Sequence, residues 1–179
     1  MSEATGAQPP TMGRKVNSGL SFRPVGRQVE VRAATSGDVG AVAEGIEELL
    51  VELGGERPPR AELEAATREL AEDPRAGALI VADADGEIVG VLAASWQLAV
   101  HVPGRYGTVQ DLWVSPEWRS RAIGRDLLEA LFALARERGI PRVEVGLPQD
   151  SFVAIEATRS FYLANGFKPL GPRLRWLAS

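Results

Sequence analysis

The sequence contains no cysteine and a single histidine, His101. Without cysteine the chain forms no disulfide, builds no zinc–thiolate site and carries no cysteine thioester intermediate. One histidine also excludes a metal centre built from several imidazole ligands, so no metal is expected. Any acyl transfer by this chain must therefore use another nucleophile or pass directly between two substrates.

Lysine and long apolar runs are scarce as well. The only lysines are Lys15 and Lys168, and the net charge of −4 with a pI near 5.2 argues against general nucleic-acid binding. No run of apolar residues is long enough to span a membrane, and the first ten residues lack the apolar core of a secretory signal. We therefore expect a cytoplasmic protein with neither a nucleic acid nor a membrane as partner.

The residues that are present suit one compact α/β domain. The chain has 179 residues, of which 45% are hydrophobic and 25% are charged, which is enough to build a sizeable core. Residues 1–28 are rich in glycine, proline and small polar residues without a clear period, so they are expected to form a flexible tail. Regular patterns begin at Val29, and residues 29–179 are predicted to form the domain.

Hydrophobic spacing and turn residues predict the order of elements. A helix is expected to end at Gly54-Gly55, a second to follow Pro58-Pro59, and a hairpin to turn at Asp85-Gly86, with a loop around Pro103-Gly104. Predicted strands are 29–33, 78–82, 87–96, 108–114, 142–147, 167–170 and 173–177, and predicted helices are 39–53, 58–73, 123–138 and 154–165. The sequence therefore predicts a mixed sheet with helices on both faces.

The connection after Val114 has the features of a phosphate-binding turn. A helix that begins near Ile123 presents unpaired N–H groups and the positive end of its dipole. The surrounding residues are basic or small: Arg119, Ser120, Arg121, Ala122, Gly124 and Arg125. Positive charge attracts an anion and small residues let it approach the backbone. The alternative is an ordinary strand–helix connection with exposed arginines.

Two motifs resemble the GNAT (GCN5-related N-acetyltransferase) family. The segment Arg119–Gly124 resembles the family's (Arg/Gln)-x-x-Gly-x-(Gly/Ala) loop, and Ala157–Phe167 resembles its helix that ends in Tyr-x-x-x-Gly-Phe. The resemblance covers residues 29–179. It implies a GNAT-type α/β fold with a mixed, mostly antiparallel central sheet and helices on both faces.

The resemblance also implies acetyl-CoA as co-substrate, without a metal. Backbone hydrogen bonds from the strand and contacts from the loop would hold it. The implied cofactor-binding residues are Leu112, Val114, Arg119, Ser120, Arg121, Ala122, Ile123, Gly124 and Arg125. Ala122 departs from the family pattern, which has glycine at the first loop position, and alanine tolerates a positive φ poorly.

Two residues are candidates for the chemistry. Tyr162 lies where many family members place a tyrosine near the coenzyme A sulfur, so it is a candidate general acid; the alternative is a tyrosine that packs at a helix end. Asp111 is a candidate general base, but it could also cap a turn or bind a cationic substrate. Gln110 stands where similar enzymes often carry a glutamate, and glutamine cannot act as a base. Because strand side chains alternate, Asp111 is expected to point to the face opposite Gln110. His101 and Glu117 are expected to be surface residues.

The sequence is thus interpreted as an N-acetyltransferase that moves an acetyl group directly to a primary amine of a small molecule or peptide. Four glutamates lie in the first predicted helix or just after it: Glu47, Glu48, Glu52 and Glu56. Their negative charge would suit a cationic amine; the alternative is a solvated acidic helix face. One alternative function is a non-catalytic coenzyme A-binding regulatory module, which Ala122 and Gln110 favour. Another is transfer of a longer acyl group. A homodimer through the C-terminal strands is also conceivable.

Overall fold

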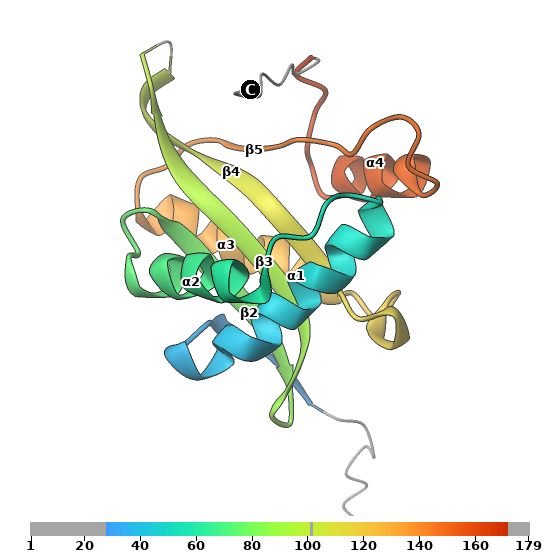
Figure 1. The fold of residues 1–179 in the computed structure, drawn as a ribbon. Coiled ribbons are helices and arrows are strands. Elements are labelled where there is room, and N and C mark those ends of the chain that lie inside the picture. Colours follow the sequence, from blue (N-terminus) through green and yellow to red (C-terminus); the bar gives the residue numbers. More distant parts are fainter. Residues whose placement is uncertain (1–27, 101, 172–179) are drawn as a thin grey trace, which may run out of the picture.

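The computed structural model describes residues 28–100 and 102–171 (Figure 1). The strands are β1 (Val29–Ala33), β2 (Gly77–Ala84), β3 (Glu87–Ala99), β4 (Val102–Val114) and β5 (Val143–Val145). The helices are α1 (Val39–Leu53), α2 (Arg60–Glu72), α3 (Ile123–Glu137) and α4 (Ile155–Ala164), and short 3-10 helices are η1 (Ser36–Asp38) and η2 (Pro116–Trp118). The predicted order from the first strand to the last helix is confirmed.

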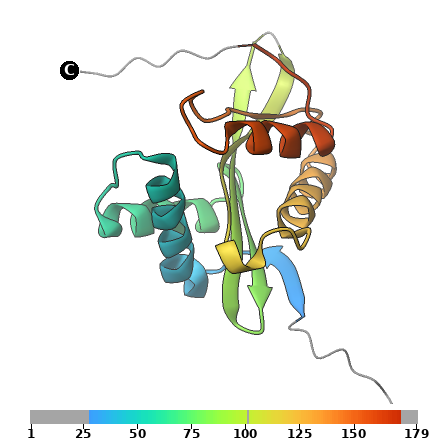
Figure 2. The ribbon, with the colours of Figure 1, turned by 90° about the vertical axis from the view of Figure 1, so that its right-hand side faces the viewer.

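The five strands form one sheet in the order β1-β2-β3-β4-β5. Neighbouring strands are antiparallel except β4 and β5, which run parallel. Helices α1 and α2 lie on one side of this sheet and α3 lies on the other (Figure 2). The predicted mixed, mostly antiparallel sheet with helices on both faces is therefore confirmed.

Each face of the sheet has its own core. On the α3 side, leucines of the helix and alternate residues of the strands are fully buried, among them Leu92, Leu127, Leu128 and Leu131. On the α1 side, Val42 and Trp113 pack with the alternate residues of β2 and β3. Burial of such side chains contributes about 1.5–3 kcal/mol each, so the two cores fix which face of β3 and β4 each remaining side chain takes.

The turn between β1 and α1 is held by a buried ion pair. The guanidinium of Arg32 donates to both oxygens of Asp38, at 2.8 and 2.9 Å, and to Asp83 at 2.8 Å. The N–H and hydroxyl of Thr35 also donate to Asp38, in the pattern of a capping box. Hydrogen bonds from Arg32, together with those from Thr35, hold the pKa of Asp38 well below its usual range although burial opposes this.

We expect Asp38→Asn to lower the free energy of unfolding by about 2 kcal/mol at pH 7, because charged hydrogen bonds are lost. Since the folded-state pKa of Asp38 is lowered, its stabilisation is present above about pH 4 and is lost as the pH falls below that value. Urea unfolding at pH 7 and pH 3 should show a smaller difference between wild type and variant at pH 3. Asp150→Asn, at an exposed position, should leave stability within about 0.5 kcal/mol. An unchanged midpoint for Asp38→Asn would contradict this role.

The structure differs from the predicted elements around β4 and after α4. Strand β4 begins at Val102, so the predicted loop at Pro103-Gly104 is wrong: cross-strand pairing of Leu98 with Arg105 carries the ladder past it. Strand β5 has only three residues, and residues 167–170 are irregular and not a strand. The predicted tail up to residue 27, His101 and the predicted strand 173–177 lie outside the described residues.

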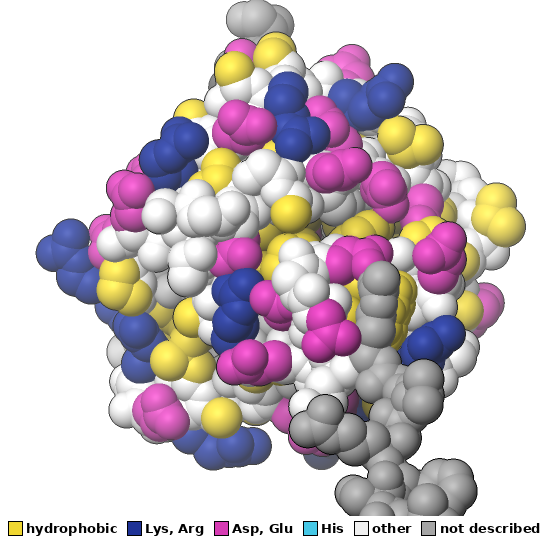
Figure 3. All heavy atoms as spheres, turned by 90° about the horizontal axis from the view of Figure 1, so that it is seen from below, with side chains coloured by type: hydrophobic (Ala, Val, Ile, Leu, Met, Phe, Trp, Pro, Cys, Tyr) yellow, Lys and Arg dark blue, Asp and Glu magenta, His cyan; other side chains and the backbone are white. Residues whose placement is uncertain are grey.

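Acidic and basic side chains are intermingled on the face seen in Figure 3. Within residues 28–100 and 102–171, no cluster of three or more histidine, cysteine, aspartate or glutamate side chains could hold a metal ion. No helix in the same ranges has the length and apolar character needed to cross a membrane.

Candidate active site

Strands β4 and β5 diverge at the centre of the sheet. They pair only through Gly107–Val109 and Val143–Val145, whereas β4 continues to Val114. Beyond Val109, β4 therefore has no strand partner on the β5 side among the described residues. The divergence leaves an open backbone edge on β4.

A bulge in β4 sets which backbone groups face this open edge. Ala93 pairs with Asp111 and Ala94 with Val109, so Gln110 is the extra residue. Ser115 N–H donates to β3 at 2.9 Å, through the carbonyl of Val89. Because backbone direction alternates along a strand, the N–H and C=O groups of Leu112 and Val114 face away from β3, toward the open edge. These are the two residues that the sequence predicted as backbone donors.

The same bulge changes the side-chain directions expected at this point. Gln110 and Asp111 were expected on opposite faces because strand side chains alternate. Gln110 Nε2 donates to Ser95 Oγ at 2.9 Å, and Asp111 pairs with Ala93, which lies on the same face as Ser95. The expectation is therefore wrong: a bulge brings two successive side chains to one face.

The predicted phosphate-binding turn joins the end of β4 to α3. Ser120 has φ 62° and Ala122 has φ 65°, both in the left-handed region, and Ala122 is the N-cap of α3. No side chain caps the helix, so its first N–H groups stay available for an anion. Alanine thus occupies the left-handed region at the first loop position. A Cβ at Gly124 would lie only 3.1 Å from the Phe161 ring, so the ring would have to shift to admit a side chain there.

The arginines of the turn all contact protein groups. Arg119 donates to the carbonyl of Val114 at 3.0 Å and pairs with Glu52 at the end of α1. Arg121 stacks on the Trp118 ring at 4.9 Å, and Arg125 pairs with Asp126. Arg119 thus ties the loop to β4 and α1, and the backbone N–H groups and helix dipole are the more direct anion-binding elements.

Relief of backbone strain at Ala122 gives a testable stability effect. We expect Ala122→Gly to raise the free energy of unfolding by about 1 kcal/mol, because glycine has no penalty at positive φ. The matched control is Ala130→Gly inside α3, which should lower it by about 1 kcal/mol. Urea unfolding measures both. Loss of stability in Ala122→Gly would show that the loop does not hold this residue in the left-handed region.

Tyr162 lies on α4 among aromatic rings. Its ring stands edge-on to Phe161 at 5.2 Å and to Phe167 at 5.3 Å between centroids, and the residue is buried. No described residue forms a hydrogen bond with its hydroxyl. Burial, with a contribution from the charge of Asp111, raises the pKa of Tyr162 to about 12. The hydroxyl is therefore protonated at neutral pH and free to donate.

Asp111 is half-buried on β4 and has no hydrogen-bond or ion-pair partner among the described residues. Burial raises the pKa of its carboxyl above the usual value. A carboxylate with a raised pKa is a stronger base than an exposed one. The charge of Asp111 acts on Tyr162, so the two candidate residues are close enough to interact electrostatically.

Several other side chains have structural roles. Asn165 caps α4 through a hydrogen bond from its side-chain amide to the carbonyl of Phe161 at 2.8 Å. Trp96 and Trp113 are buried in the two cores. Glu47 pairs with Arg60, so this glutamate of the acidic group has a partner within the protein.

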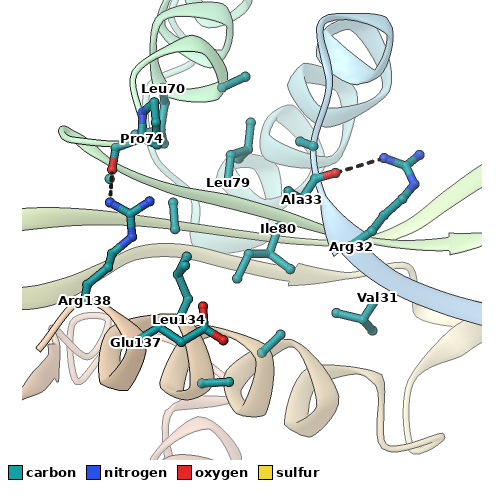
Figure 4. A pocket seen from close by; sticks show the side chains of 16 residues that line it. Val31, Arg32, Ala33, Leu70, Pro74, Leu79, Ile80, Leu134, Glu137 and Arg138 are labelled. Atoms are coloured by element: carbon teal, nitrogen blue, oxygen red, sulfur yellow. Dashed lines mark hydrogen bonds between the residues drawn. The ribbon is translucent and has the colours of Figure 1, made fainter. Parts of the chain in front are cut away.

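Sequence reasoning missed two features of the site. One is the Glu52–Arg119 ion pair, whose members lie 67 positions apart and carry no local signal. The other is a set of polar side chains on β3 and β4 that includes Ser95 and Gln97, for which the alternation of polar residues was an available signal. A hollow of about 410 Å³ elsewhere, between α2 and α3 at the β1–β2 edge, contains none of the candidate site residues (Figure 4).

Comparison with known proteins agrees with the resemblance. An IAA acetyltransferase from Azospirillum brasilense is 34% identical over 95 residues, which are 52% of this chain and 60% of that protein. The match therefore spans less than two thirds of the relative's length.

Solved structures share the fold. The aminoglycoside N-acetyltransferase AAC(6')-Iy, solved in complex with CoA, has a TM-score of 0.71 at 16% identity, over 88% of this chain and 99% of that chain. A transcriptional regulator from Bacillus halodurans C-125 has a TM-score of 0.71 at 24% identity, over 84% of this chain and 100% of that chain. The family model for the acetyltransferase (GNAT) family matches residues 43–167. The chain belongs to the acetyltransferase (GNAT) family.

Proposed function

We propose that this chain transfers an acetyl group from acetyl-CoA directly to a primary amine of a small molecule or peptide. The observation that carries the proposal is an open strand edge and an uncapped helix N-terminus next to Asp111, whose charge acts on Tyr162. The open edge of β4 and the uncapped N-terminus of α3 lie at the two ends of one short segment, Leu112–Ile123. Asp111 directly precedes this segment, and its charge acts on Tyr162.

The residues of the chain fit an extended donor with a diphosphate. The outward-facing backbone N–H groups of Leu112 and Val114 suit an arm that adds to the sheet like an extra strand, while the carbonyl of Val114 is bound by Arg119. The N–H groups at the start of α3 suit the diphosphate, supported by the helix dipole. Membership of the family and the CoA complex of AAC(6')-Iy support acetyl-CoA as the donor.

Asp111 and Tyr162 supply the two proton transfers. Asp111 accepts a proton from the ammonium form of the acceptor, so that the neutral nitrogen attacks the thioester carbonyl and forms the new C–N bond. As the C–S bond breaks, the hydroxyl of Tyr162 donates its proton to the departing sulfur, and the phenolate takes up the second proton that the nitrogen loses as the amide forms. The absence of cysteine agrees with direct transfer, because the chain carries no thiol to hold the acetyl group.

An amine panel tests the proposal. Wild-type protein is incubated with acetyl-CoA and one amine at a time, and free thiol and N-acetylated product are quantified by a thiol reagent and mass spectrometry. We expect equal amounts of both products with at least one amine, and slower turnover with succinyl-CoA. Binding of CoA by calorimetry without acetylation of any amine would instead support a non-catalytic regulatory module.

A further inference from the structure

A row of uncharged polar side chains extends from Asp111 along one face of β3 and β4. Strand register pairs Ser95 with Thr108 and Gln97 with Tyr106. Cross-strand partners and residues two apart share a face, so these side chains lie on the face of Ala93, the register partner of Asp111. The polar row is defined as Ser95, Gln97, Tyr106, Thr108 and Gln110.

Hydrogen bonds connect most of the polar row. The Tyr106 hydroxyl donates to Gln97 Oε1 at 2.5 Å, and Gln97 Nε2 donates to Ser95 Oγ at 3.4 Å. Gln110 Nε2 donates to the same Ser95 oxygen at 2.9 Å. These bonds orient the side chains before any ligand binds.

The polar row still has unused hydrogen-bonding capacity. Ser95 Oγ accepts two hydrogen bonds, and its own hydroxyl hydrogen has no acceptor within the row. The side-chain oxygen of Gln110, Oε1, receives no hydrogen bond from the row. The Thr108 hydroxyl is 4% exposed and has no partner. A buried polar group without a hydrogen-bond partner destabilises the folded protein. The position of Thr108 beside other unused donors and acceptors therefore fits a ligand that supplies both hydrogen-bond donors and acceptors.

The polar row carries no formal charge. Glu47 and Glu52 of α1, on the same side of the sheet, are paired with Arg60 and Arg119. Asp111, next to the row, is a negative charge available to a cationic amine, and the row is suited to neutral groups that both donate and accept hydrogen bonds. Hydroxyl groups have that property.

We infer that the polar row recognises hydroxyl groups of the acceptor, so that the substrate class is a hydroxylated amine, such as an amino alcohol or amino sugar, with its nitrogen at Asp111. This inference rests on the proposed acetyl transfer and adds the substrate class to it. The row binds hydroxyls on the carbons adjacent to the amine-bearing carbon while Asp111 takes the proton.

A matched pair of amines tests the inference. Serinol and isopropylamine have the same carbon skeleton and differ in hydroxyl groups. We expect wild-type kcat/KM, expressed per neutral amine, to be at least about 10-fold higher for serinol, because a hydrogen-bonding site rejects an analogue that leaves it unpaired. Ser95→Ala and Gln97→Leu should reduce this ratio to below about 3-fold by raising KM for serinol.

Control measurements distinguish a failure of hydroxyl recognition from a failure of acetyl transfer. Gln28→Leu makes the same substitution before β1, at the far end of the sheet, and should keep the wild-type ratio. KM for acetyl-CoA should be unchanged in both row variants, and thermal unfolding confirms that they fold. Turnover of both amines at equal efficiency, or an unchanged ratio in both folded row variants, would overturn the inference alone. No thiol release with any amine would overturn the acetyl transfer and the inference with it.

Discussion

Tyr162→Phe is expected to lower kcat about 100-fold or more, the usual contribution of a positioned general acid. The substitution removes only the hydroxyl, which has no partner among the described residues, and the ring contacts with Phe161 and Phe167 remain. Stability at pH 7 should therefore stay within about 1 kcal/mol of wild type. Steady-state kinetics with a saturating amine, together with calorimetric CoA affinity, measures the effect.

The pH dependence sharpens this prediction. The pKa of Tyr162 is raised to about 12 by burial and by the charge of Asp111, so the hydroxyl stays protonated through pH 10. Wild-type kcat should then show no loss below pH 10 from ionisation of this group. Wild type should lose stability as the pH rises from about 10 toward 12, because the folded state disfavours the phenolate, whereas the Phe variant should lack this component. Wild-type kcat in the Phe variant at every pH would remove Tyr162 from the mechanism.

Asp111→Asn is expected to lower kcat/KM about 100-fold at pH 7 and to raise stability at the same pH. The loss of activity follows because an amide cannot accept the proton of the amine. The gain in stability follows because burial raises the pKa of Asp111, so its charged form is destabilising in the folded protein above that pKa. Catalytic groups that are strained or desolvated commonly trade stability for activity in this way.

Unfolding measurements at two pH values check the sign for Asp111. The stabilisation by Asn should be present at pH 7 and should vanish as the pH falls below the ordinary carboxyl pKa of about 3.9, where the carboxyl is neutral in both states. Asp150→Asn, an exposed aspartate, is the matched control and should change neither activity nor stability. An Asn variant that is less stable at pH 7 would show that the carboxylate has a stabilising partner, and unchanged kcat/KM would exclude it as the base.

Local patterns were sufficient for most of the fold. The helical spacing of apolar residues predicted α1 and α3. The ends of both helices were also predicted closely, because a glycine with positive φ follows each of them, at Gly54 and Gly139. The hairpin at Asp85-Gly86 was also confirmed, and both residues have positive φ. These features depend on neighbours in the sequence, which is why sequence reasoning finds them.

Features that depend on distant pairing were not predictable. The bulge at Gln110 arises from how β4 pairs with β3 around Ala93 and Ala94. No nearby turn residue marks it, yet it turns Gln110 and Asp111 to one face. The Glu52–Arg119 contact likewise needs the tertiary fold. Sequence reasoning therefore named the donor loop and both catalytic candidates, but the arrangement of the acceptor side required the structure.

Amine-dependent acetylation by wild type and by the Tyr162→Phe/Asp111→Asn double variant tests the proposed chemistry most directly. Both proteins are supplied with acetyl-CoA and an amine that wild type uses, and N-acetylated product and free thiol are counted in the same reaction. We expect wild type to form one product molecule per thiol, and the double variant to bind CoA with wild-type affinity but to turn over at least about 100-fold more slowly. Acetylation by the double variant at the wild-type rate would contradict the assignment of these two residues as the acid–base pair.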